Sequence, residues 1–300
     1  MSSTSGDFRQ HVTVQTLAEK KRKREPIVSL TAYDYITAHL ADAAGVDLIL
    51  VGDSLAQVVL GYENTLPVTM EEMLHHTRAV RRAVRRAFLV ADMPFGSYHS
   101  NARKAVENAV RFVKDGGAEA VKIEGGVARL PLVHRILEAE IPMVGHIGLT
   151  PQSVHRMGGY KVQGKTPSAI DALMADAEAL DHAGVCALVL EGIPREVAAR
   201  ITAAVTTPTI GIGAGPDCDG QILVFHDLAG LTVHPPAKFV RRYVQAGEVI
   251  SQAIHSYCED VRSGAFPADA ESYHLPRESS HGTASRPQAE ANPAPLAGRK

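Results

Sequence analysis

The sequence is poor in the features that mark secreted, membrane and nucleic-acid-binding proteins. It has three cysteines, Cys186, Cys218 and Cys258, too few and too far apart for a disulfide framework or a zinc site. No run approaches the ~20 apolar residues that cross a bilayer, and the polar start MSSTSGDFRQHVT has no apolar signal core. The formal net charge of -2 gives no electrostatic basis for binding nucleic acid or an acidic membrane. These absences predict a soluble, cytoplasmic protein.

Short apolar runs alternate with helix-like segments from Pro26 onward. Each run ends at Gly or at a polar residue, as is typical of strands buried on both faces of a parallel sheet. Helices are expected between most of these runs, including one at 70–86, where Thr69 and Glu72 form a capping box, and a last one at 238–257. The predicted strands are residues 27–32, 46–51, 88–92, 120–123, 143–147, 187–190, 209–212 and 222–225.

Alternating βα units leave two main architectures, an open doubly wound sheet and a closed (β/α)₈ TIM barrel. Eight units in roughly 230 residues match the usual size of the barrel. Polar residues end nearly every predicted strand, whereas an open sheet would concentrate them at one switch point. The sequence therefore favours an α/β protein of the barrel type.

Composition divides the chain into three parts. Residues 1–10 are expected to form a flexible N-terminus and residues 11–262 the barrel. Residues 263–300 form a tail rich in Pro, Ser and Ala that has little apolar periodicity. We expect this tail to be largely disordered, apart from some packing near Tyr273–Leu275.

Acidic residues stand at the ends of three consecutive predicted strands. They are Asp53, Asp92 and Glu124, and in a barrel the carboxyl ends of the strands surround one mouth. Ligation by oxygen alone suits Mg²⁺ best, with Mn²⁺ or Ca²⁺ as alternatives. Any one of these acids could instead cap a helix or pair with Arg, but three together favour a metal site.

Three further polar residues lie at the same predicted rim. Lys122 lies two residues before Glu124, so both side chains share a face, and a buried lysine there could bind a substrate oxyanion. His146 ends the fifth strand and is either a hydrogen-bonded structural group or a participant in catalysis. Glu191 ends an apolar strand, where partial desolvation would raise its pKa toward that of a general base. Its alternative role is to cap the helix after Pro194.

Seven segments resemble, in the same order, those of the ketopantoate hydroxymethyltransferase family. The resemblance covers residues from about Val12 to Ile254 and implies a barrel of the phosphoenolpyruvate/pyruvate superfamily. The implied reaction, in pantothenate and coenzyme A biosynthesis, is transfer of a hydroxymethyl unit from 5,10-methylenetetrahydrofolate to 3-methyl-2-oxobutanoate, giving 2-dehydropantoate. The resemblance also implies a homo-oligomer, a decamer. The segments are VGDSL, GYENTLPVTMEEM, ADMPFGSY, AVKIEGG, VGHIGLTPQ, LVLEGIP and GIGAGPDCDGQILVFHDLAGL.

The same resemblance implies roles for the rim residues. Asp53 and Asp92 would bind Mg²⁺ directly, with Glu124 in the same metal site. The oxoacid would contact Asp53, Ser54, Asp92 and Lys122. Glu191 would be the proton acceptor, and His146 remains a further candidate on its position alone.

Two alternatives remain, one within the enzymes and one from another functional class. A lyase or mutase of the same superfamily would be expected to carry a cysteine-containing loop, and no cysteine lies at a strand-end acid motif. A catalytically silent barrel acting as a binding protein would have no need of the acids and the lysine together.

Overall fold

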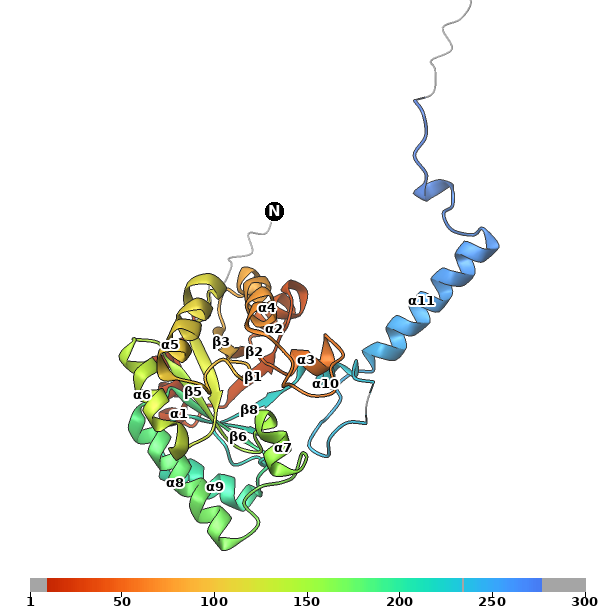
Figure 1. Cartoon of the computed structure of the whole chain (residues 1–300). Helices are drawn as coiled ribbons and strands as arrows, with labels where there is room; N and C mark the ends of the chain where they lie inside the picture. Colours follow the sequence, from red (N-terminus) through yellow and green to blue (C-terminus); the bar gives the residue numbers. More distant parts are fainter. Residues whose placement is uncertain (1–9, 234, 277–300) are drawn as a thin grey trace, which may run out of the picture. The chain divides into compact units, whose positions relative to one another are not determined.

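The computed structural model describes residues 10–233 and 235–276. They belong to two compact units, the first ending at Val249 and the second beginning at Ile250. The first unit contains a closed barrel of eight parallel strands, in which each strand pairs with the next and β8 pairs with β1 (Figure 1). This confirms the predicted (β/α)₈ barrel. The flexible N-terminus expected at 1–10 lies outside the described residues, except for Gln10.

All eight predicted strands are present, with bounds that differ by a few residues from the expected ones. Their order around the barrel follows the sequence. The strands are β1 (Ile27–Thr31), β2 (Leu48–Val51), β3 (Phe88–Asp92), β4 (Ala120–Glu124), β5 (Met143–Gly148), β6 (Ala187–Glu191), β7 (Thr209–Ile212) and β8 (Gly220–Leu223).

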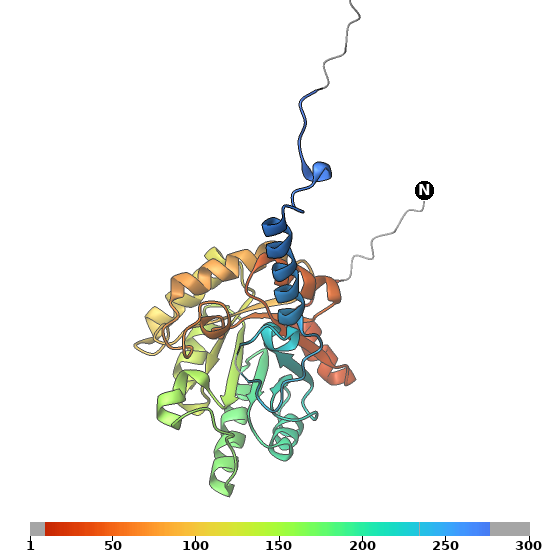
Figure 2. The ribbon, with the colours of Figure 1, turned by 90° about the vertical axis from the view of Figure 1, so that its right-hand side faces the viewer.

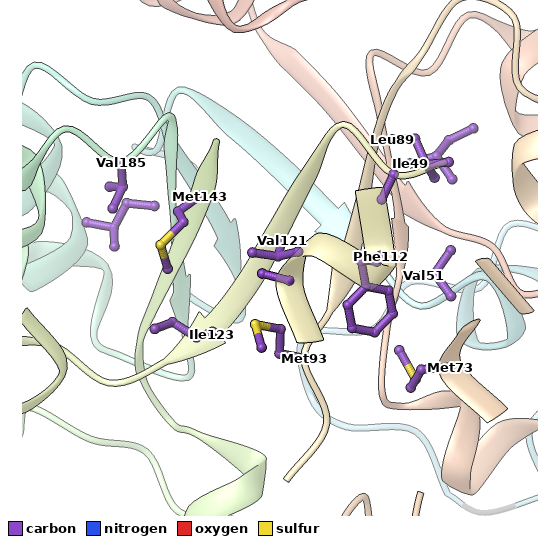
Figure 3. Packing of buried hydrophobic residues seen from close by; sticks show 14 of the residues in the cluster. Ile49, Val51, Met73, Leu89, Met93, Phe112, Val121, Ile123, Met143 and Val185 are labelled. Atoms are coloured by element: carbon purple, nitrogen blue, oxygen red, sulfur yellow. The ribbon is translucent and has the colours of Figure 1, made fainter. Parts of the chain in front are cut away.

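The strands are apolar on both faces because each face packs against a separate core. Val121 and Ile123 of β4 point outward into the larger core, which also holds Phe112 (Figure 3). Because side chains alternate along a strand, Lys122 and Glu124 point into the barrel. The expectation that these two residues share one face is confirmed.

Helices surround the strands of the barrel (Figures 1 and 2). Many begin with a capping residue, and the predicted capping box of Thr69 and Glu72 is present. The helices are α1 (Val14–Lys23), α2 (Tyr35–Ala44), α3 (Leu55–Val58), α4 (Met70–Ala83), α5 (Ala102–Arg111), α6 (Leu130–Glu138), α7 (Val154–Met157), α8 (Pro167–Ala183), α9 (Arg195–Ala204), α10 (Phe225–Ala229) and α11 (Ala246–Ser263), with shorter helical turns η1 (Phe112–Gly116), η2 (Val127–Arg129), η3 (Pro151–Ser153) and η4 (Asp269–Glu271).

Helix α4 ends three residues earlier than its sequence predicts. The side chain of Asp42 accepts hydrogen bonds from the backbone N–H groups of Arg85, Arg86 and Ala87. These bonds give the backbone partners outside the helix, so the expected extension to residue 86 is wrong. The sequence of α4 alone could not predict where the helix ends, because Asp42 lies 43 residues before Arg85.

The connection from β7 to β8 contains no helix and comprises residues 213–219. Glycine is required where β8 begins, because a Cβ atom on Gly220 would lie 2.4 Å from the carbonyl oxygen of Ile27. This close approach accompanies the β8–β1 pairing that closes the barrel.

The last helix, α11, begins eight residues later than predicted, so residues 238–245 are not helical. Several of its apolar side chains are about half exposed or more. Beyond it, Tyr273 and Leu275 are exposed, so the packing expected there is absent from the described part of the chain. No helix among the described residues is long and apolar enough to cross a membrane.

Candidate active site

The structure brings together every site residue that the sequence predicts at the mouth of the barrel. Asp92, Lys122, Glu124, His146 and Glu191 lie at or near the ends of four neighbouring strands, β3 to β6. The backbone pairing places Lys122 opposite Asp92 and Glu124 opposite His146. The first four of these residues are at most 5% exposed, whereas Glu191 is partly exposed.

An ion pair and two further contacts form a row from β3 to β6. Lys122 Nζ lies 2.9 Å from Asp92 Oδ1 and 3.2 Å from His146 Nδ1. On the other side of the imidazole ring, His146 Nε2 lies 3.1 Å from Glu191 Oε2. A charged Lys122 can only donate, so it donates to Nδ1 and the ring proton belongs on Nε2, facing Glu191.

Asp53 and Ser54 complete the mouth from the end of β2. The backbone N–H of Asp53 donates to Asp92 Oδ2 at 2.9 Å, which joins the two acids. The Ser54 hydroxyl oxygen lies 2.7 Å from the Tyr33 hydroxyl oxygen. Tyr33 is fully buried and fixes this serine, a partnership that the strand pattern did not predict.

The site holds more negative than positive charge. Burial, and next the charge of Asp92, raise the pKa of Asp53 to about 7. Burial and the charge of Asp53 likewise raise the pKa of Glu124. Burial alone would lower the pKa of Lys122, but the surrounding carboxylates outweigh it and raise that pKa above its ordinary value.

The same environment keeps His146 neutral. Burial and the neighbouring Lys122 ammonium lower the pKa of its imidazole. A neutral ring can accept from Lys122 at Nδ1 while presenting its Nε2 proton to Glu191. His146 therefore connects the ammonium group to the outermost acid of the site.

The donor set fits an oxygen-coordinated divalent cation. Three buried carboxylates, on Asp53, Asp92 and Glu124, share a single ammonium group. Asp92 Oδ1 is buried and, despite its ion pair, accepts no hydrogen bond of good geometry from the described residues. A divalent cation would neutralise this excess of buried negative charge. In the described residues, no three His, Cys, Asp or Glu side chains already form a metal-binding cluster.

Gln152 and Tyr98 are site residues that sequence reasoning missed. Gln152 Nε2 donates to Asp53 Oδ2 at 2.8 Å, and its backbone N–H donates to Glu124 Oε2 at 2.9 Å. Tyr98 donates to Gln152 Oε1 at 2.6 Å. A glutamine in a polar loop and a tyrosine beyond a strand are common, so neither residue type indicates a functional role in the sequence.

A cavity of about 650 Å³ adjoins the acids, with Glu124 and Gln152 in its wall. The cationic groups in its lining are Arg129, whose guanidinium lies 5.4 Å from the centre of the Tyr98 ring, and Arg156. Apolar side chains complete the wall, including Leu66, Phe95, Ile147, Met157 and Leu173.

Similar structures share this barrel. A phosphonopyruvate hydrolase solved in complex with oxalate and Mg++ superposes with a TM-score of 0.57 at 14% identity, covering 88% of this chain and 92% of the other. A 2,3-dimethylmalate lyase, a PEP mutase/isocitrate lyase superfamily member, gives 0.56 at 15% identity, covering 87% and 91%. At these identities the likeness shows the fold.

Sequence relatives are much closer. The family model described as ketopantoate hydroxymethyltransferase matches residues 11–269. A 3-methyl-2-oxobutanoate hydroxymethyltransferase from Koribacter versatilis is 70% identical over 278 residues, 93% of this chain and 94% of the relative. The enzyme of the same name from Thermoanaerobacter sp. is 53% identical over 266 residues, 89% and 97% of the two chains. The chain therefore belongs to the ketopantoate hydroxymethyltransferase family of enzymes, as its motifs predict.

Proposed function

We propose that the protein transfers a hydroxymethyl unit from 5,10-methylenetetrahydrofolate to 3-methyl-2-oxobutanoate, giving 2-dehydropantoate for pantothenate and coenzyme A biosynthesis. The observation that carries the proposal is the row of contacts from Asp92 through Lys122 and His146 to Glu191. It places an ammonium group and a carboxylate on opposite sides of one imidazole, around the mouth where an oxoacid would enter.

In this proposal Asp53 and Asp92 hold Mg²⁺, with Glu124 in the same site. The cation, when bound, supplies positive charge that stabilises a developing oxyanion on the keto group of the substrate. Ser54 orients the oxoacid, and the Lys122 ammonium donates toward the oxyanion. Both side chains are held in place before the substrate arrives, Ser54 by Tyr33 and Lys122 by Asp92 and His146.

Glu191 acts as the general base. Its carboxylate takes the proton from C3 of the oxoacid, and the electron pair of the broken C–H bond passes into the enolate. Both bonds from the methylene carbon to folate nitrogens break in the reaction: one is replaced by the new bond to C3, the other by a bond to the oxygen of a water molecule, which becomes the hydroxyl group. The two nitrogens take up the proton removed from C3 and one proton from that water, so tetrahydrofolate is released.

Cysteine chemistry of the lyase type has little support. Burial raises the pKa of the Cys186 thiol to about 12 and that of Cys218 to about 11. A nucleophile or acid–base group needs a thiol that ionises more readily than these.

A silent barrel is equally disfavoured, because a binding protein gains nothing from burying three carboxylates around one lysine.

The test is an assay of the purified protein for 2-dehydropantoate with 3-methyl-2-oxobutanoate, 5,10-methylenetetrahydrofolate and Mg²⁺. Product is expected only when all three are present. Exchange of the C3 proton without product would indicate a different acceptor chemistry. Neither exchange nor product would indicate a silent barrel.

The cavity beside Glu124 gives the folate a place to bind. Replacing Arg129 or Arg156 with Met is expected to raise the KM for 5,10-methylenetetrahydrofolate about tenfold or more, because a charge-assisted hydrogen bond contributes roughly 1.5–3 kcal/mol. Exchange of the C3 proton of the oxoacid should change little. Arg135→Met is the matched control, since Arg135 pairs with Glu138 on α6 and is absent from the cavity lining. An unchanged KM in both cavity variants would place the folate elsewhere.

We also propose that the protein is a cytoplasmic homo-oligomer, a decamer. Support comes from α11, where Val249, Ile254 and Tyr257 are each more than half exposed, because apolar area of this kind is stabilised when a partner covers it. Light scattering should give about ten times the chain mass of 32.1 kDa, and a monomeric mass would contradict the proposal.

The proposed cytoplasmic location is supported by the free thiols at all three cysteines, which suit a reducing compartment. Cell fractionation can check this location.

A further inference from the structure

Gln152 contacts the ends of three other strands from its position after β5. Its side-chain NH₂ group donates to Asp53 Oδ2, beyond β2, and at 3.0 Å to the carbonyl oxygen of Met93, beyond β3. Its backbone N–H donates to Glu124 Oε2, at the end of β4. The residue is 6% exposed, so water does not compete strongly for these bonds.

Tyr98 fixes which way the amide of Gln152 points. Its hydroxyl donates to Gln152 Oε1 at 2.6 Å and accepts from the backbone N–H of Glu124 at 3.2 Å. With its oxygen held by Tyr98, the amide must direct its NH₂ group toward Asp53. Tyr98 is 2% exposed, and its ring lies beneath the Arg129 guanidinium.

We propose that Gln152, oriented by Tyr98, is a positioning residue that holds Asp53 and Glu124 ready to receive the divalent cation; this inference rests on the proposed metal site. Gln152 occupies one carboxylate oxygen of each acid. Asp53 Oδ1 has no hydrogen-bond partner among the described residues, and Glu124 Oε1 has only the 3.6 Å approach of His146 Nδ1. Each acid therefore retains one oxygen for a metal.

A neutral donor suits this task better than a charged one. An amide N–H fixes a carboxylate oxygen without adding positive charge, so it does not repel an incoming cation as a second lysine would. Residues that hold metal ligands from behind commonly contribute 10–100-fold to metal affinity or activity. A merely structural Gln152 would support the folded state and leave the metal affinity of the folded protein unchanged.

The test is titration of the full-length protein with Mg²⁺ alone by calorimetry, and with Mn²⁺ alone by electron paramagnetic resonance. Gln152→Met keeps the length of the side chain and the backbone N–H but removes the amide. We expect Mg²⁺ affinity to fall roughly 10–100-fold and the Mn²⁺ spectrum to change. Gln221→Met is the matched control, because that amide is exposed and donates to the carbonyl of Gly215, not to a carboxylate of the site. Its metal affinity should equal that of the wild type.

Tyr98→Phe removes a single hydroxyl and keeps the proposal testable if Gln152→Met fails to fold. It should weaken Mg²⁺ binding in the same direction, because Tyr98 holds the Gln152 amide and also accepts from the backbone N–H of Glu124. Unchanged or tighter binding in the folded variants would overturn the proposal. If the wild type itself bound no Mg²⁺, the metal site of the proposed function would fall too, whereas normal wild-type binding would leave that site standing.

Discussion

Asp53→Asn and Asp92→Asn are each expected to lose most of the Mg²⁺ affinity and most of the activity of the protein while it stays folded. An amide keeps the shape of the carboxylate but loses the negative charge and one of its two acceptor oxygens, which a hard cation requires. The loss of a direct ligand should exceed the ~10–100-fold cost of changing a residue behind the ligands. Calorimetric titration with Mg²⁺ and the 2-dehydropantoate assay measure the two effects.

The fold should survive because the metal-free site has an excess of negative charge. Asp53 is buried beside Asp92, and among the described residues the Lys122 ammonium is the one that pairs with these acids. Neutralising one carboxylate lowers the cost of burying the others, so the melting temperature of Asp53→Asn should not fall. Asp171→Asn, an exposed position on α8, is the control. Unchanged Mg²⁺ binding in both site variants would remove this metal site.

The barrel and its rim were predictable because both follow from local patterns. Buried parallel strands are apolar throughout and end sharply, so the runs before Asp53, Asp92 and Glu191 could be located from the sequence. Parallel strands of a closed barrel then bring their carboxyl ends to one mouth. The shared face of Lys122 and Glu124 follows from the two-residue period of a strand.

The remaining features depend on partners that are distant in the sequence. Asp42 ends α4 from 43 to 45 residues away, and Tyr98 orients Gln152 from 54 residues away. No local sequence pattern predicts such contacts, since neither glutamine nor tyrosine is unusual in a loop. The role of Ser54 is implied by the family resemblance alone, whereas the metal site is also predicted by the acids at the ends of three consecutive strands.

Replacing Glu191 with Gln is expected to stop exchange of the C3 proton of 3-methyl-2-oxobutanoate with deuterated water. The amide keeps the size of the side chain and can still contact His146, whose Nε2 lies 3.1 Å from Glu191 Oε2. It cannot accept a proton, and the loss of a general base typically costs 10²–10⁴-fold in rate, or roughly 3–5 kcal/mol of barrier. Nuclear magnetic resonance follows the exchange, first without folate and then with tetrahydrofolate present.

The affinities for Mg²⁺ and for the oxoacid should change little in Glu191→Gln, because Glu191 is not assigned to the metal. This separates the prediction from that for Asp53 and Asp92, where metal affinity falls together with activity. Glu196→Gln, an exposed position on α9 five residues further along, is the matched control and should exchange at the wild-type rate. If Glu191→Gln also exchanged at that rate, the base would lie elsewhere, and His146, buried between Lys122 and Glu191, would be the next residue to test.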